Sequence, residues 1–107
     1  MDFTKVMSRN INKMPDFPED EMVRYRIVLR EKYYWVVLKM GFAKMINQLN
    51  FTGWMNFADK DSVEIIIQGM NNKVAYFLDK LEKNKCVEIM EKKSIPVCTI
   101  EQTFMVY

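Results

Sequence analysis

Alternating apolar and polar residues predict the strands of this chain. From Met22 to Arg30 every second residue is apolar, which is typical of a strand that buries one face. Residues 51–57 and 63–68 also favour strands, and the polar residues 59–62 between them are typical of a turn. These two segments are therefore predicted to form a β-hairpin. The remaining strand-like segments are 86–93 and 103–107, with Pro96 between them.

Two other segments carry apolar residues at helical spacing. The first covers about residues 38–49, and Asn50 is a suitable left-handed stop for it. The second continues to about Lys83, with Asn71 or Asn72 as its N-cap. The core-facing residues predicted from the strand and helix patterns are Val23, Tyr25, Ile27, Leu29, Leu38, Phe42, Met45, Ile46, Leu49, Val63, Ile65, Ile67, Val74, Phe77, Leu78 and Leu81.

The order of these elements predicts the fold. It reads β-α-β-β-α-β with a short C-terminal strand. Right-handed crossovers fold this order into an antiparallel sheet with two helices on one face. We therefore expect an α+β protein, a ferredoxin-like α/β sandwich. This domain is expected to span residues 21–107, after an N-terminal extension and proline-containing linker at residues 1–20.

The composition is that of an ordinary globular chain. A formal net charge of +2 over 107 residues is too small to indicate nucleic acid or an acidic membrane as a partner. No apolar run is long enough to cross a membrane, and the N-terminal residues lack the apolar block of a signal peptide. We therefore expect a cytoplasmic protein that does not bind a membrane.

Catalysis by a metal or by a histidine-activated nucleophile is not expected. The chain contains no histidine and only two cysteines, Cys86 and Cys98. These residues do not form a zinc-binding pattern, and Ser-His and Cys-His pairs are excluded. Because the core is large enough without a cross-link, the two cysteines need not pair. No metal and no cofactor are expected.

The hairpin resembles that of the acylphosphatase family. That family has Gly-Trp-Val-x-Asn, a short turn, and then Ser/Thr-Val-x-x-x-x-x-Gly. Here the corresponding residues are Gly-Trp-Met-Asn-Phe at 53–57 and the segment from Ser62 to Gly69, with no gap in the spacing. The resemblance covers about residues 22–107. It implies the same ferredoxin-like fold, and an enzyme that hydrolyses the carboxyl-phosphate bond of acyl phosphates without a metal or covalent intermediate.

The residues at the implied active site differ from those of the family. The resemblance implies a glycine-rich phosphate-binding loop after the first strand, an arginine at its end, and an asparagine that positions the attacking water. The arginine position holds Lys39, the asparagine position holds Phe57, and Asn56 lies one residue early. Because a one-residue step turns a side chain to the other face, Asn56 could serve only if a bulge shifts the register. The phosphate-loop candidates are Tyr33, Tyr34, Trp35, Val36, Val37, Leu38 and Lys39.

These differences lead to three hypotheses. The first is a binding or interaction module that has lost efficient hydrolysis, in which Tyr33, Tyr34 and Trp35 contact an unknown protein or small anionic ligand. The alternative is a divergent acylphosphatase with Lys39 as phosphate ligand and Asn56 or a backbone group placing the water. The third is a weak RNA-binding module on the open sheet face. The absence of aromatic residues at 63–68 argues against nucleic acid.

Overall fold

A computed structural model describes residues 15–31, 35–57, 62–85 and 87–107, with the backbone alone described at residues 31 and 35–39. The first fourteen residues of the predicted extension lie outside this part of the chain. The elements are β1 (Met22–Glu31), α2 (Trp35–Gln48), β2 (Thr52–Asn56), β3 (Ser62–Met70), α3 (Asn71–Lys83), β4 (Val87–Ile95) and β5 (Phe104–Val106).

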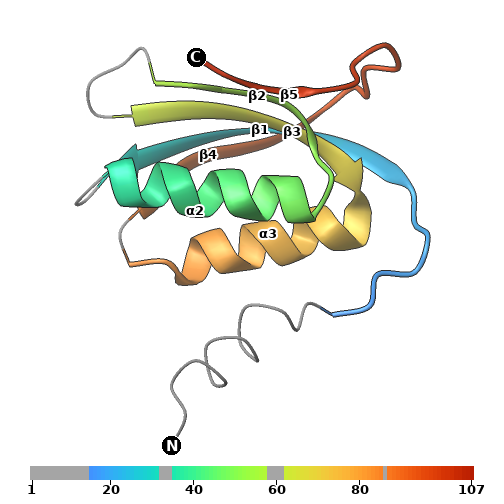
Figure 1. Cartoon of the computed structure of the whole chain (residues 1–107), viewed down its shortest axis with the longest axis horizontal. Helices are drawn as coiled ribbons and strands as arrows, with labels where there is room; N and C mark the ends of the chain where they lie inside the picture. The colour runs from blue at the N-terminus through green and yellow to red at the C-terminus, as the bar shows by residue number, and fades with distance from the viewer. Residues whose placement is uncertain (1–14, 32–34, 58–61, 86) are drawn as a thin grey trace, which may run out of the picture.

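The strands form one sheet in the order β4-β1-β3-β2-β5. The first four are paired antiparallel, and Figure 1 shows both helices on the same face of the sheet. The predicted ferredoxin-like α/β sandwich is therefore confirmed. The fifth strand adds a parallel pair, because β5 runs beside β2 in the same direction. The segment after β4 connects one edge of the sheet to the opposite edge, where β5 pairs with β2. The sheet is mixed because this last pair is parallel and the other pairs are antiparallel.

The hydrophobic core lies between the sheet and the two helices. Ile27 and Leu29 of β1 and Phe77 of α3 are fully buried. The Phe77 ring makes edge-to-face contacts with Phe42 of α2, at 6.3 Å between centroids, and with Phe51, at 5.6 Å. Phe77 therefore connects both helices and the start of the hairpin. The predicted core residues that are half-buried at the margin are Val23, Tyr25 and Met45, and the others with described side chains are buried.

The start of α3 differs from the sequence prediction. The helix begins at Asn71 itself, and the N-cap position is held by Met70, which makes no side-chain capping bond. Asp20 of the linker instead accepts a hydrogen bond from the backbone N–H of Asn72 at 3.0 Å. The Asn72 side chain donates to the backbone oxygen of Pro18 at 2.8 Å. The predicted cap is wrong because the bonding group comes from a distant part of the chain, which leaves no local pattern.

The start of α2 also differs from the prediction. The helix begins at Trp35, earlier than the expected start near residue 38. Val36 and Val37 have branched side chains that favour strands, so they gave no helical signal. At the other end, Asn50 has a φ of 56°, which confirms the predicted left-handed stop. Neither α2 nor α3 is long and apolar enough to cross a membrane.

Gly53 is a point of close backbone contact within the hairpin. Its φ is +132°, and a Cβ at this position would lie 1.9 Å from the backbone oxygen of Ile66 on β3. Residues other than glycine rarely adopt this conformation. The added Cβ would also clash with backbone atoms of β3, which cannot move aside as a flexible side chain could. Glycine is therefore required at position 53.

Replacing Gly53 by alanine is expected to destabilise the domain by at least about 2–3 kcal/mol, because both the strained φ and the clash act together. The matched control is Gly41→Ala in α2, where a Cβ would meet nothing within 4 Å and alanine favours the helix. Thermal unfolding followed by circular dichroism compares the two variants. Equal midpoints would contradict the expectation.

Candidate functional site

The family resemblance places a phosphate site at one end of the sheet. Figure 1 shows that the end of β1, the start of α2 and the end of β2 lie at this end together. Tyr33 and Tyr34 lie outside the described residues. The backbone of residues 35–39 forms the first turns of α2, so Trp35 and Lys39 are helical rather than part of an extended loop.

Asn56 and Phe57 lie at the same end but on different faces of the sheet. The pairing of β2 with β3 is continuous to Asn56, which lies opposite Glu64. Met55 faces the core, so Asn56 faces the open side of the sheet. Phe57 is half-buried and packs against the core. The bulge that would bring Asn56 to the family's asparagine position is therefore not present in this pairing.

Arg26 lies on the open face between two carboxylates. Its guanidinium donates to Glu64 at 2.5 Å and to Glu91 at 2.6 Å. The hydrogen bond to Glu91, followed by that to Glu64, raises the pKa of Arg26 above its ordinary value. The charge of this arginine is therefore already balanced across three neighbouring strands, β3, β1 and β4.

A second polar network fixes the segment that connects β4 to β5. Gln68 of β3 is buried, and its side chain donates to the backbone oxygen of Cys98 at 2.9 Å and accepts from the backbone N–H of Cys98 at 2.8 Å. Arg24 of β1 donates to Glu101 at 2.7 and 3.1 Å and to Gln68 at 3.2 Å. This network holds the connecting segment against the open face of the sheet.

The ionisation of Glu101 depends on this network. Burial raises the pKa of its carboxyl group, but the hydrogen bonds from Arg24, the neighbouring Thr52 hydroxyl and the positive charge of Arg24 together outweigh that effect, so the pKa lies below its usual value. Sequence reasoning missed the network because its members are far apart in the chain. The one local signal is Gln68, a polar residue that ends the apolar run of β3.

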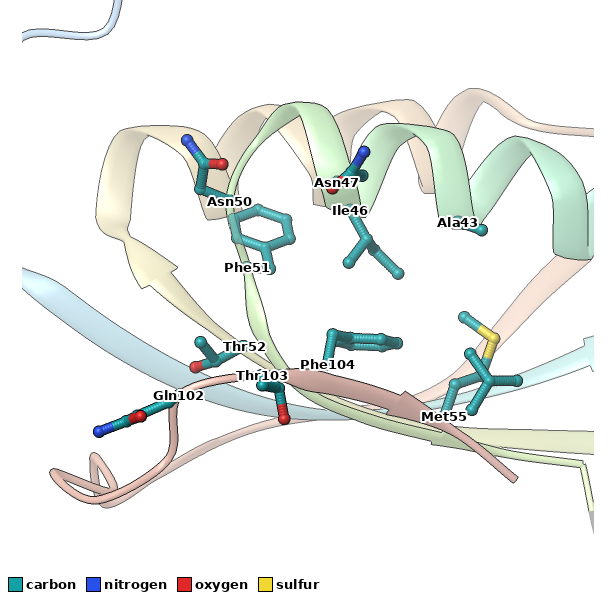
Figure 2. A pocket seen from close by; sticks show the side chains of 11 residues that line it. Ala43, Ile46, Asn47, Asn50, Phe51, Thr52, Met55, Gln102, Thr103 and Phe104 are labelled. Carbon is teal, nitrogen blue, oxygen red and sulfur yellow. The ribbon is translucent and has the colours of Figure 1, made fainter.

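A groove of about 520 Å³ lies between α2 and the strands β2 and β5. Figure 2 shows Phe104 of β5 between Ile46 above it and the strands, with Asn47 on α2 and Asn50 on the segment that follows the helix. None of the residues that line the groove is charged. It therefore offers no cationic side chain to a phosphate group.

No described residues suggest a metal site. In the parts of the chain that the structure covers, no three Asp, Glu, His or Cys residues are grouped in a way that could hold a metal ion.

Comparisons with known proteins bear on the fold. No family model matches the sequence, and no curated protein matches it. The crystal structure of acylphosphatase from Bacillus subtilis is similar, with a TM-score of 0.65 and 16% identity over 79% of this chain and 98% of that one. An acylphosphatase from Coxiella burnetii is similar with a TM-score of 0.65 and 17% identity, over 80% and 93% of the two chains.

A larger protein contains the same fold as one part. T. kodakarensis HypF is similar with a TM-score of 0.65 and 20% identity, over 79% of this chain and 12% of that one. Identities this low establish an acylphosphatase-like fold and do not establish a function.

Replacing Glu101 by glutamine is expected to cost roughly 1.5–3 kcal/mol at pH 7, because the half-buried Arg24 loses its charged partner. A carboxylate whose folded-state pKa is lowered stabilises the fold above its unfolded pKa of about 4.3, and this contribution is lost as pH falls through the folded pKa. The difference from the parent protein should therefore shrink progressively below about pH 4. Urea unfolding at several pH values measures it.

The control for this prediction is Glu88→Gln, which removes an exposed carboxylate of β4 that is outside the network. It should change stability little at any of these pH values. A Glu101→Gln penalty that is absent at pH 7, or unchanged in acid, would show that the Arg24–Glu101 pair does not stabilise the fold.

Proposed function

We propose that this acylphosphatase-like domain has lost efficient acyl-phosphate hydrolysis and acts as a binding or interaction module. The observation that carries the proposal is the pair Asn56 and Phe57. The position of the water-orienting asparagine is occupied by Phe57, whose side chain has no group to orient water and packs against the core. Asn56, the nearest amide, faces the opposite side of the sheet.

The start of α2 supports the same proposal. The family's loop uses glycines so that backbone N–H groups can approach and surround a phosphate. Between Glu31 and Lys39 this chain has no glycine, and its backbone is helical from Trp35 onward. A lysine at position 39 would keep a positive charge but would lose the two parallel bonds that an arginine makes to a phosphate.

The proposed contact surface is the aromatic segment Tyr33, Tyr34 and Trp35, together with Lys39 four residues further along the chain. Three consecutive aromatic residues provide a large area for a protein partner, and a nearby lysine suits a small anionic ligand. RNA is less well supported as a partner. Two arginines of the open face, Arg24 and Arg26, are already paired with carboxylates, so these two offer little net attraction to phosphates.

An acylphosphatase assay with benzoyl phosphate tests the loss of hydrolysis. We expect turnover near the uncatalysed rate, and Lys39→Ala should leave it unchanged within about twofold, because no water-positioning group is present. The control is Lys44→Ala, which removes an exposed lysine elsewhere on α2.

Turnover that disappears in Lys39→Ala and persists in Lys44→Ala would refute the proposal. That result would favour the alternative function, a divergent acylphosphatase in which Lys39 binds the phosphate.

A further inference from the structure

The two edges of the sheet differ in charge. The edge strand β4 carries four exposed charged residues, Glu88, Glu91, Lys92 and Lys93. Charged side chains on an edge strand oppose pairing with another strand. At the other edge, residues 102–107 contain no charged side chain, and Met105, Val106 and Tyr107 are exposed by 50%, 42% and 66%. The β5 edge therefore lacks the protection that the β4 edge has.

The backbone of β5 presents a defined set of hydrogen-bonding groups at this edge. The Thr103 oxygen accepts from the Gly53 N–H at 3.1 Å, and the Tyr107 N–H donates to the Met55 oxygen at 2.8 Å. Backbone groups of alternate residues in a strand point in opposite directions. The N–H and C=O groups of Phe104 and Val106 therefore point away from β2. Because β5 is the last strand of the described sheet, no strand accepts them.

We infer that two copies of this chain associate by pairing their β5 strands antiparallel, across a two-fold axis at Met105. In this register Phe104 of one copy lies opposite Val106 of the other. Both residues direct their backbone groups outward, so each such pair exchanges two N–H···O bonds. The two-fold axis generates a second, identical pair of Phe104 and Val106, so the two copies share four hydrogen bonds. All outward-pointing N–H and C=O groups of β5 are then paired.

The side chains are compatible with the same register. Phe104 and Val106 line the groove on the helix face of the sheet, as Figure 2 shows for Phe104. Opposite residues in an antiparallel pair share a face, so Phe104 of one copy meets Val106 of the other on that side. The two Met105 side chains meet on the open face. No like-charged side chains are brought together, since residues 102–107 have no charged side chain.

The resulting assembly is closed and weak. Each copy uses the uncharged β5 edge of its described sheet, and the free edges of the continuous sheet are then the two charged β4 strands, which oppose further addition. A strand of three residues buries little surface, so the association belongs to the small, transient class of interfaces. This inference goes beyond the proposed function, because it holds whether or not the domain hydrolyses acyl phosphates.

Sedimentation analysis of the full chain from about 10 μM to about 1 mM tests the inference, since weak interfaces associate in this range. The parent protein should change from monomer to dimer with rising concentration. Val106→Pro should remain monomeric and keep the parent's thermal midpoint, because the N–H that it removes points away from β2. The matched control Val106→Thr keeps this N–H and should dimerise within about tenfold of the parent.

Hydrogen exchange gives an independent measurement. The amides of Phe104 and Val106 should exchange quickly in dilute solution and become protected at high concentration, while that of Met105, which faces β2, is protected in both. If Val106→Pro does not fold, Met105→Lys replaces it. Met105 is half-exposed, so the lysine can be accommodated in the monomer. In the dimer the two lysines would lie next to each other at the two-fold axis, and their repulsion should abolish the dimer at low salt.

Three results would overturn the inference. The first is a parent protein that stays monomeric over the whole concentration range. The second is a folded Val106→Pro or Met105→Lys variant that dimerises as the parent does, and the third is a Val106→Thr variant that loses association as completely as Val106→Pro. If the parent protein is monomeric, the alternative is that an extended segment of a different protein pairs with β5.

Discussion

Two helices can cover the width of only about four strands. A helix with its side chains is about 10 Å across, and strands are spaced at about 4.8 Å, so two helices side by side match four strands closely. In this domain α2 and α3 pack around Phe77 on the sheet, and the fifth strand lies beyond them. The groove between α2 and β5 results from this mismatch in width.

The residues that build the hairpin and those that would carry out catalysis are under different constraints. Gly53 must be a glycine because the backbone of β3 leaves no space for a Cβ. No similar constraint acts on Phe57, since the core at this margin accepts a large apolar side chain. A chain can therefore keep the acylphosphatase-like fold, which depends on packing, while a residue of the implied chemistry is replaced.

Long-range polar contacts position the less regular segments. Asp20 bonds to the start of α3 and fixes the linker, and the contacts of Gln68 and Arg24 with residues 98 and 101 hold the last connection against the open face. The positive charge of Arg24 on the open face is thereby paired within the protein. The open face is thus used in large part for the protein's own stability.

The sequence by itself determined the elements, the core and the class of fold, because burial of one face imposes a period that can be read locally. Alternation located β1 and β3, and helical spacing located α3 with its buried residues. Tertiary structure alone decided the cap of α3, the direction of β5 and the faces of Asn56 and Phe57. These three features depend on a bonding partner elsewhere in the chain or on the register between strands. Such long-range contacts produce no periodic pattern in the sequence of the residues concerned.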